Sequence, residues 1–225
     1  ESIMLALSSF EMPAYLDSAN HRGINARRDI LTAAPVAYLS MEDGVLSCSE
    51  NAKEIVQGSI DSQIFINDIR VLKEHFLPEP NDSRSILIEA DYCGAIIAHL
   101  GYPVLHSKSQ LRITDAFVGV YLWTIVADHE LRSCSLRFHP SCAVGYIEMI
   151  SSRVTAAVAV RKLIDFQLTS RFEQQSSYEA YENAFNAIKA HIDRGDCYQV
   201  NLTQCFKASS QGDPLAAYLT LRKAT

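Results

Sequence analysis

The chain has 225 residues, of which 48% are hydrophobic and 20% charged, and its formal net charge at pH 7 is −6. This composition is typical of a folded globular protein with one large or two small domains, and the acidic balance argues against a nucleic-acid partner. No apolar run has the length of a membrane span, and the N-terminus lacks the layout of a signal peptide, so we expect a cytoplasmic protein with no membrane partner.

The spacing of cysteine and histidine residues gives no metal or redox motif. The six cysteines contain no Cys-x-x-Cys pair, so we expect reduced thiols rather than a disulfide framework, and the seven histidines are scattered. The sequence also lacks a glycine-rich phosphate loop and a Gly-x-Ser-x-Gly turn. Glu89 and Asp91 form a carboxylate pair that we interpret as solvated charge rather than as an acid/base or metal pair.

Short strands are predicted in the N-terminal part of the chain. They are expected to form a meander, with strands at residues 12–18, 27–31, 36–39 and 45–48 and a hairpin turn at Asp43-Gly44. A helical period then runs from residue 61 to residue 76 and ends before Pro78. Its expected apolar stripe consists of Ile64, Ile66, Ile69, Val71, Leu72 and Phe76.

The middle of the chain is predicted to be rich in strands. Strands are expected at residues 85–92 and 94–100, and the strongest strand signal runs without a break from residue 116 to residue 128. Residues 131–138 are predicted to pair back on this strand after the turn Asp128-His129-Glu130. Trp123 is expected in the hydrophobic core.

A helix is predicted at residues 146–160, followed by a polar stretch without regular structure to residue 175. After residue 175, a helix, a strand and a second helix are predicted. The first starts at Ser176 or Ser177, and Gly195 caps its end in a left-handed conformation. Its expected buried stripe consists of Tyr181, Phe185, Ile188 and Ile192. An alternating strand at residues 196–208 follows, and the last helix begins at Pro214. Because strands and single helices lack βαβ spacing, we predict an α+β fold.

The segment after that glycine cap carries a family resemblance. From Gly195 to Leu202 it reads Gly-Asp-Cys-Tyr-Gln-Val-Asn-Leu, and Gln204 and Phe206 follow. This segment resembles the signature of the chorismate-utilising enzymes, which include the first components of aminodeoxychorismate synthase and anthranilate synthase. Within the family, Asn201 favours the aminodeoxychorismate branch over the anthranilate branch.

The resemblance covers nearly the whole chain, but only the N-terminal half of a family member. Weaker matches occur in the expected order at Leu16-Asp17-Ser18, Arg27, Ala34-Pro35 and residues 94–102 and 118–129, while Pro103 and Cys205 depart from the pattern. The implied fold is the N-terminal half of a four-layer α/β/β/α architecture with two orthogonally packed, mainly antiparallel sheets. Residues 1–170 would form the N-terminal region, and residues 171–225 the start of the chorismate-binding domain.

The implied function is an amination subunit that converts chorismate and ammonia to 4-amino-4-deoxychorismate, on the route to 4-aminobenzoate and folate. A glutamine amidotransferase subunit would be the partner, and Mg²⁺ the cofactor. The family's catalytic and metal-binding residues lie in its C-terminal half, so we expect none before Thr225, and we expect this fragment alone to be inactive. Two alternatives stay open: anthranilate synthase component I, and a non-catalytic regulatory or amidotransferase-docking half.

One binding site of the family falls within this half. Some members bind tryptophan, and the resemblance places that site at Ser18, Asn25, Ala26, Arg27 and Arg28. A hydroxyl and a guanidinium group suit the ammonium and carboxylate ends of an amino acid. The alternative interpretation is a serine at a strand end beside a surface pair of arginines.

Overall fold

The computed structural model describes residues 2–18, 27–43, 45–58, 62–78, 92–101, 115–157 and 163–224 of the chain. The chain divides into two compact units, Glu1–Arg161 and Lys162–Thr225. Residues 85–91 of the strand predicted at 85–92, and with them the carboxylates of Glu89 and Asp91, lie outside the described residues; Tyr92 is a turn residue. The family-derived boundary at residue 170 stays a prediction.

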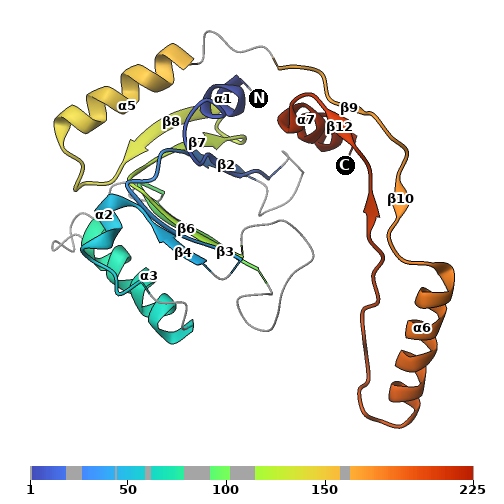
Figure 1. The fold of residues 1–225 in the computed structure, drawn as a ribbon. Coiled ribbons are helices and arrows are strands. Elements are labelled where there is room, and N and C mark those ends of the chain that lie inside the picture. The colour runs from blue at the N-terminus through green and yellow to red at the C-terminus, as the bar shows by residue number, and fades with distance from the viewer. Residues whose placement is uncertain are drawn as a thin grey trace. The chain divides into compact units, whose positions relative to one another are not determined.

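The described part of the first unit contains two antiparallel four-stranded sheets (Figure 1). The first contains, in spatial order, β1 (Ala14–Leu16), β2 (Arg28–Thr32), β7 (Trp123–Asp128) and β8 (Ser133–Phe138). The second contains β4 (Val45–Cys48), β3 (Ala37–Glu42), β6 (Ala116–Tyr121) and β5 (Ala95–Leu100). The predicted α+β class and the four N-terminal strands are confirmed. The expected meander is wrong, because β2 and β3 pair in different sheets.

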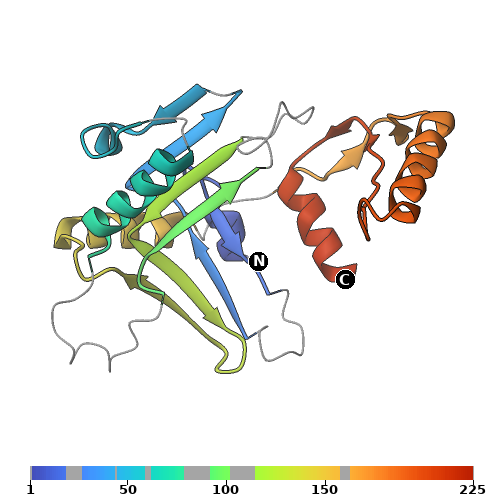
Figure 2. The same ribbon diagram turned by 90° about the horizontal axis from the view of Figure 1, so that it is seen from below.

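Helices cover the outer sides of these sheets. In Figure 1, α1 (Ser2–Leu7) and α5 (Val144–Ala157) lie beside the first sheet, and α2 (Glu50–Lys53) and α3 (Ser62–Phe76) beside the second. Figure 2 agrees, with α3 (teal) and α5 (gold) on opposite sides of the strands. The sequence pattern predicts α3 and α5 but neither α1 nor α2, because helices of six and four residues are too short to show a helical period.

The strand signal at residues 116–128 divides into two strands. The chain bends at Leu122, so that β6 is an inner strand of the second sheet and β7 an inner strand of the first. Two backbone carbonyls at the bend accept hydrogen bonds. The Leu122 carbonyl accepts the N–H of His139 at 2.8 Å, and the Trp123 carbonyl accepts the hydroxyl of Thr32 at 2.6 Å. The prediction of a single strand is wrong, because nearly every residue of both strands is buried and the apolar run hides the bend. The β7–β8 hairpin and the buried position of Trp123 are confirmed.

Helix α3 packs on the second sheet through a stripe that includes a charged residue. Phe65 and Leu72 are buried among apolar side chains of β3 and β6. Asp68 is also buried, and its carboxylate accepts two backbone N–H groups of the preceding loop, each at 3.0 Å. The predicted apolar stripe includes Ile66, but this side chain is 58% exposed and the neighbouring Phe65 takes the core position.

The second unit contains two helices and two short antiparallel strand pairs among its described residues. β9 (Gln167–Leu168) pairs with β12 (Ser210–Gln211), and β10 (Glu173–Gln174) pairs with β11 (Phe206–Lys207). Helix α6 (Tyr178–Asp193) begins as predicted after Ser177, whose hydroxyl accepts the N–H of Ala180 at 3.1 Å. Helix α7 (Pro214–Ala224) begins at Pro214, which confirms that prediction as well.

Two predictions for the second unit are wrong. Residues 196–205 form no strand, because only Phe206 and Lys207 of the alternating segment meet a pairing partner; Figure 1 shows the chain returning from α6 without a strand before β11. Helix α6 has no buried residue, since no described element of the unit covers its apolar face. That face consists of Tyr181, Phe185, Ile188 and Ile192.

The backbone of the second unit can be tested at Gly212. This residue has a φ of +92°, and a Cβ atom there would lie 2.1 Å from the carbonyl oxygen of Asp165. Gly212→Ala is therefore expected to lower the free energy of unfolding, measured by urea titration, by about 1–3 kcal/mol through backbone strain. Gly145→Ala is the matched control, because an added Cβ there meets nothing within 4 Å. Equal stability of the two variants would contradict the described conformation.

Candidate functional site

Three of the five residues predicted to bind tryptophan lie at one end of the first sheet. Ser18 follows β1, Arg28 begins β2, and Arg27 directly precedes it. The register of β2 and β7 pairs the start of β2 with the end of β7, so the turn after β7 lies beside these residues. The other two, Asn25 and Ala26, lie outside the described residues.

Asp128, the last residue of β7, binds both arginines. Its Oδ2 atom accepts the Nε–H of Arg27 at 2.9 Å and the Nε–H of Arg28 at 3.0 Å. Its Oδ1 atom accepts the backbone N–H groups of Glu130 and Leu131 at 3.1 and 2.9 Å, which closes the turn. The Leu131 N–H and the two guanidinium groups lower the pKa of Asp128 to about 2, against the opposing effect of burial. Asp128 is therefore ionised at neutral pH.

The two arginines differ in their remaining contacts. Arg27 forms a second ion pair with the exposed Glu130, in which Nη1 lies 3.0 Å from Oε2. The guanidinium carbon of Arg28 lies 5.8 Å from the centroid of the Tyr92 ring, within the range of a cation–π contact. Hydrogen bonding to Asp128 raises the pKa of Arg28. A ligand carboxylate could reach Arg27 by replacing Glu130, whose side chain is exposed to solvent.

Asp29 connects Ser18 to the turn after β7. Its Oδ1 atom accepts the backbone N–H and the hydroxyl of Ser18 at 2.9 and 2.7 Å. Its Oδ2 atom lies 2.9 Å from Nε2 of His129, which is close enough for an ion pair but not aligned for a hydrogen bond. Because Ser18 donates its hydroxyl proton to Asp29, its oxygen presents lone pairs, and these suit a ligand ammonium group.

The family resemblance points to the serine and the arginines but not to the carboxylates that hold them. Asp29 and Asp128 are both buried, and buried carboxylates need cationic or hydrogen-bonding partners. A signal for them exists in the sequence, since Arg27-Arg28-Asp29 and Asp128-His129-Glu130 carry complementary charges at the ends of two predicted strands. The structure brings these two segments together as ion pairs, so a ligand here would compete with existing contacts.

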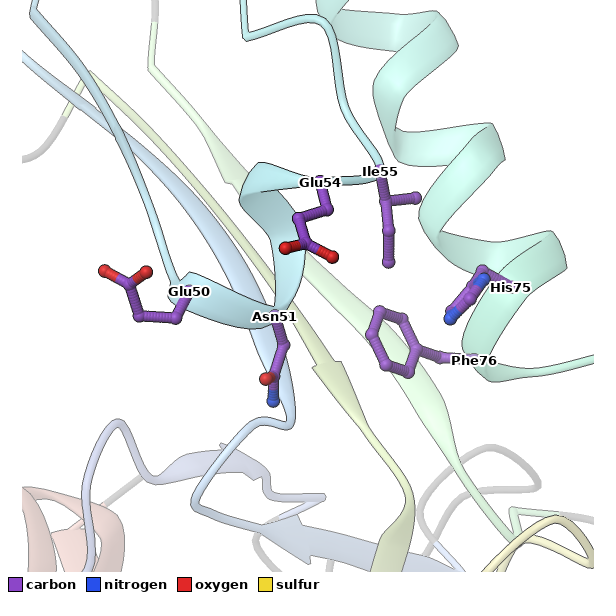
Figure 3. Close-up of a pocket in the computed structure, with 6 residues that line it drawn as sticks. All are labelled: Glu50, Asn51, Glu54, Ile55, His75 and Phe76. Atoms are coloured by element: carbon purple, nitrogen blue, oxygen red, sulfur yellow. The ribbon is translucent and has the colours of Figure 1, made fainter.

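A separate hollow with a volume of about 450 Å³ lies between α2 and the end of α3. Figure 3 shows Glu54, Ile55 and Phe76 turned toward one another and Glu50 turned away. The side chain of Asn51, which also lines the hollow, donates a hydrogen bond at 2.8 Å to the backbone carbonyl of Val36, the residue before β3. Glu50 pairs with a lysine one turn later. Two of its polar side chains therefore support the local fold, and we assign no chemistry to this hollow.

The family resemblance implies Mg²⁺, which is bound by oxygen ligands. Within the described ranges no group of three or more His, Cys, Asp or Glu side chains could hold a metal ion. The described residues therefore do not fit a Mg²⁺ site, which needs several oxygen ligands around one ion. Among the same residues, no helix is both long and apolar enough to cross a membrane.

The signature motif begins at the end of α6. Gly195 has a φ of +80°, which confirms the predicted left-handed cap. The N–H groups of Gly195 and Asp196 donate to two carbonyls in the last turn of α6, each at 3.0 Å, and these are the two hydrogen bonds of a Schellman motif. Gln199 and Asn201 further along the motif are exposed. In the second unit, the motif thus presents amide side chains from an irregular segment rather than from a strand.

The model of the family described as chorismate binding enzyme matches residues 42–225. This match covers more than half of the chain and includes the signature motif at the end of α6. The chain therefore belongs to the chorismate binding enzyme family, which confirms the resemblance drawn from the sequence.

Particular relatives show how far the likeness extends. Aminodeoxychorismate synthase component 1 from Klebsiella aerogenes is 27% identical over an alignment of 228 positions, which covers 97% of this chain and 47% of the relative. The protein of the same name from Escherichia coli K12 is 30% identical over 118 residues, or 52% of this chain and 25% of the relative. The crystal structure of anthranilate synthase component I from Streptococcus pneumoniae has a TM-score of 0.66 at 21% identity and covers 91% of this chain and 47% of that one.

An identity of 21% to the pneumococcal enzyme shows a shared fold and nothing finer. The chain spans about half the length of two curated relatives that it matches, with shares of 47% and 42% for the Klebsiella aerogenes and Salmonella typhimurium proteins.

The arginine–carboxylate cluster predicts a pH-dependent stability that involves Asp128. Because its folded-state pKa lies at about 2, below the ordinary value of 3.8, its contribution is complete above about pH 4 and is lost as the pH falls toward 2. Asp128→Asn is expected to be less stable than the wild type at pH 7, and the difference should shrink between pH 4 and pH 2. Urea unfolding across this range measures both quantities.

Glu130→Gln serves as the control, because it removes an exposed partner of the same arginine and should change stability far less at each pH. Parallel stability curves for the wild type and Asp128→Asn down to pH 2 would show that the carboxylate makes no such contribution.

Proposed function

We propose that the native protein containing this chain aminates chorismate to 4-amino-4-deoxychorismate. The observation that carries this proposal is the family match over residues 42–225, which includes the Gly-Asp-Cys-Tyr-Gln-Val-Asn-Leu motif. The named curated relatives from Klebsiella, Salmonella and Escherichia are all aminodeoxychorismate synthase component 1. Asn201 supports the same branch of the family.

In the proposed reaction, a C–O bond to the ring hydroxyl breaks, a C–N bond to ammonia forms, and water leaves. Bound Mg²⁺ would supply neutralising charge for the substrate carboxylate. We expect its ligands and the catalytic side chains beyond residue 225, so no chemical step is assigned to a residue of this chain. The printed name of the relatives, component 1, supports a second component, and we propose a glutamine amidotransferase that supplies the ammonia.

Product identity tests this proposal. The native protein, incubated with chorismate, Mg²⁺ and an ammonium salt, is expected to form 4-amino-4-deoxychorismate, identified by mass spectrometry after separation. Anthranilate as the product would instead favour the second candidate, anthranilate synthase component I, which the family match leaves open. A protein made of residues 1–225 alone is expected to turn over no chorismate, and turnover by it would refute the placement of the catalytic groups beyond this chain.

We further propose that the cluster around Ser18 and Arg27 binds tryptophan. The Ser18 oxygen can accept from the ligand ammonium group, and the Arg27 guanidinium can bind the ligand carboxylate once Glu130 moves away. The buried Asp29 and Asp128 would hold both groups in place during binding.

Calorimetric titration of the native protein with tryptophan tests this site. Arg27→Ala is expected to abolish detectable binding, because it removes the carboxylate partner. Glu130→Gln should keep or tighten binding, since it removes the exposed competitor without disturbing Asp128. Unchanged affinity in Arg27→Ala would exclude the assigned pocket.

A further inference from the structure

Three polar side chains contact one another at the C-terminal end of helix α6: His191, Arg194 and Asp196. We call these three residues the α6 clasp. The Oδ2 atom of Asp196 lies 2.8 Å from Nδ1 of His191 and accepts the Nε–H and Nη2–H of Arg194 at 3.2 and 2.9 Å. Nη2 of Arg194 also lies 2.9 Å from Nδ1 of His191, so each group contacts the other two. Basic side chains at this position also complement the negative end of the helix dipole.

The α6 clasp fixes the start of the signature segment. The backbone N–H of Asp196 donates to the carbonyl of His191 at 3.0 Å, so Asp196 is held through both its backbone and its side chain. The described residues 197–204 then form neither helix nor strand. The next backbone contact is at Cys205, whose carbonyl accepts the N–H of Gln175 at 2.9 Å. The segment is therefore anchored at its two ends, and the α6 clasp is the first anchor.

The residues between these anchors carry the polar side chains of the signature. Gln199 and Asn201 are exposed, and Tyr198 is 92% exposed, so packing within the second unit does not set their course. Within residues 1–225, their placement therefore follows from the direction in which the segment leaves α6. Binding groups must be held to within about half an ångström to act well, so the anchor affects what these amides can do.

We propose that Asp196 is a positioning residue, which sets the path of residues 197–204 through Arg194 and His191 and thereby places the signature amides for the chorismate site. The inference rests on the proposed function. Asp196 acts here through its neighbours and not on the substrate, because its Oδ2 atom is already surrounded by three nitrogen atoms.

The test compares Asp196→Ala and Asp196→Glu with wild type in the native full-length protein. Asp193→Asn is the matched control, because it removes one exposed carboxylate from the last residue of the same helix. Hydrogen exchange reports on the backbone amides of residues 195–205, and steady-state kinetics with chorismate and ammonium salt report on the reaction.

We expect Asp196→Ala to speed exchange of the Gly195 and Asp196 amides about tenfold or more while the melting temperature of the protein stays close to wild type. Its kcat/KM for chorismate should fall by about one to two orders of magnitude with an unchanged KM for ammonium, since only the placement of chorismate-facing groups is disturbed. Asp196→Glu should recover part of both losses, and Asp193→Asn should match wild type.

Two results would overturn the proposal. Unchanged hydrogen exchange in Asp196→Ala would show that the α6 clasp does not hold the segment. Faster exchange combined with wild-type kinetics would show that Asp196 only caps helix α6 and does not position the signature amides. If the wild-type protein turns over no chorismate, the proposed function fails by itself, and the exchange comparison still decides whether Asp196 positions the segment.

Discussion

At Leu122 one apolar stretch of chain passes from the second sheet into the first, and the described architecture of the first unit follows from this crossing. Gly119 allows it on the β6 side, because a Cβ atom there would lie only 2.8 Å from the Tyr121 ring. Burial raises the pKa of Tyr121 to about 12, and its hydroxyl donates to the carbonyl of Met12 at 2.9 Å. That bond ties the segment before β1 to β6, while β7 pairs with β2, so the crossing also places the arginine pair at the start of β2.

The charge cluster at the start of β2 and the end of β7 shows how buried carboxylates govern what nearby cations can bind. Asp29 and Asp128 are both buried. Asp128 accepts hydrogen bonds from both arginines and from the turn after β7, whereas Asp29 accepts two from Ser18 and lies beside His129. Arg27 therefore has Asp128 as a fixed partner and Glu130 as an exposed one. An anionic ligand at this site would have to replace Glu130 as the second partner of Arg27. Its binding free energy therefore contains only the difference between its own ion pair with Arg27 and the one that Glu130 makes, and this difference is small at an exposed position.

Local sequence signals predict where helices and strands begin and end better than they predict which elements pair or pack with one another. The serine cap of α6, its glycine end and the proline start of α7 are each one-residue effects, and the structure confirms them. The bend at Leu122 has no such signal because both flanking strands are almost fully buried, and the alternation of residues 196–205 predicts a strand that finds no partner. The same limit applies to the site: Ser18 and Arg27 follow from the family resemblance, whereas Asp128 requires the β2–β7 register.

The central functional claim is that the native protein supplies 4-amino-4-deoxychorismate. Genetic complementation tests it most directly, with the native gene placed in a bacterial strain that lacks aminodeoxychorismate synthase component 1 and in another that lacks anthranilate synthase component I. We predict growth of the first strain without added 4-aminobenzoate and no growth of the second without tryptophan. Growth of the second strain alone would contradict the proposed function and assign the protein to anthranilate synthesis.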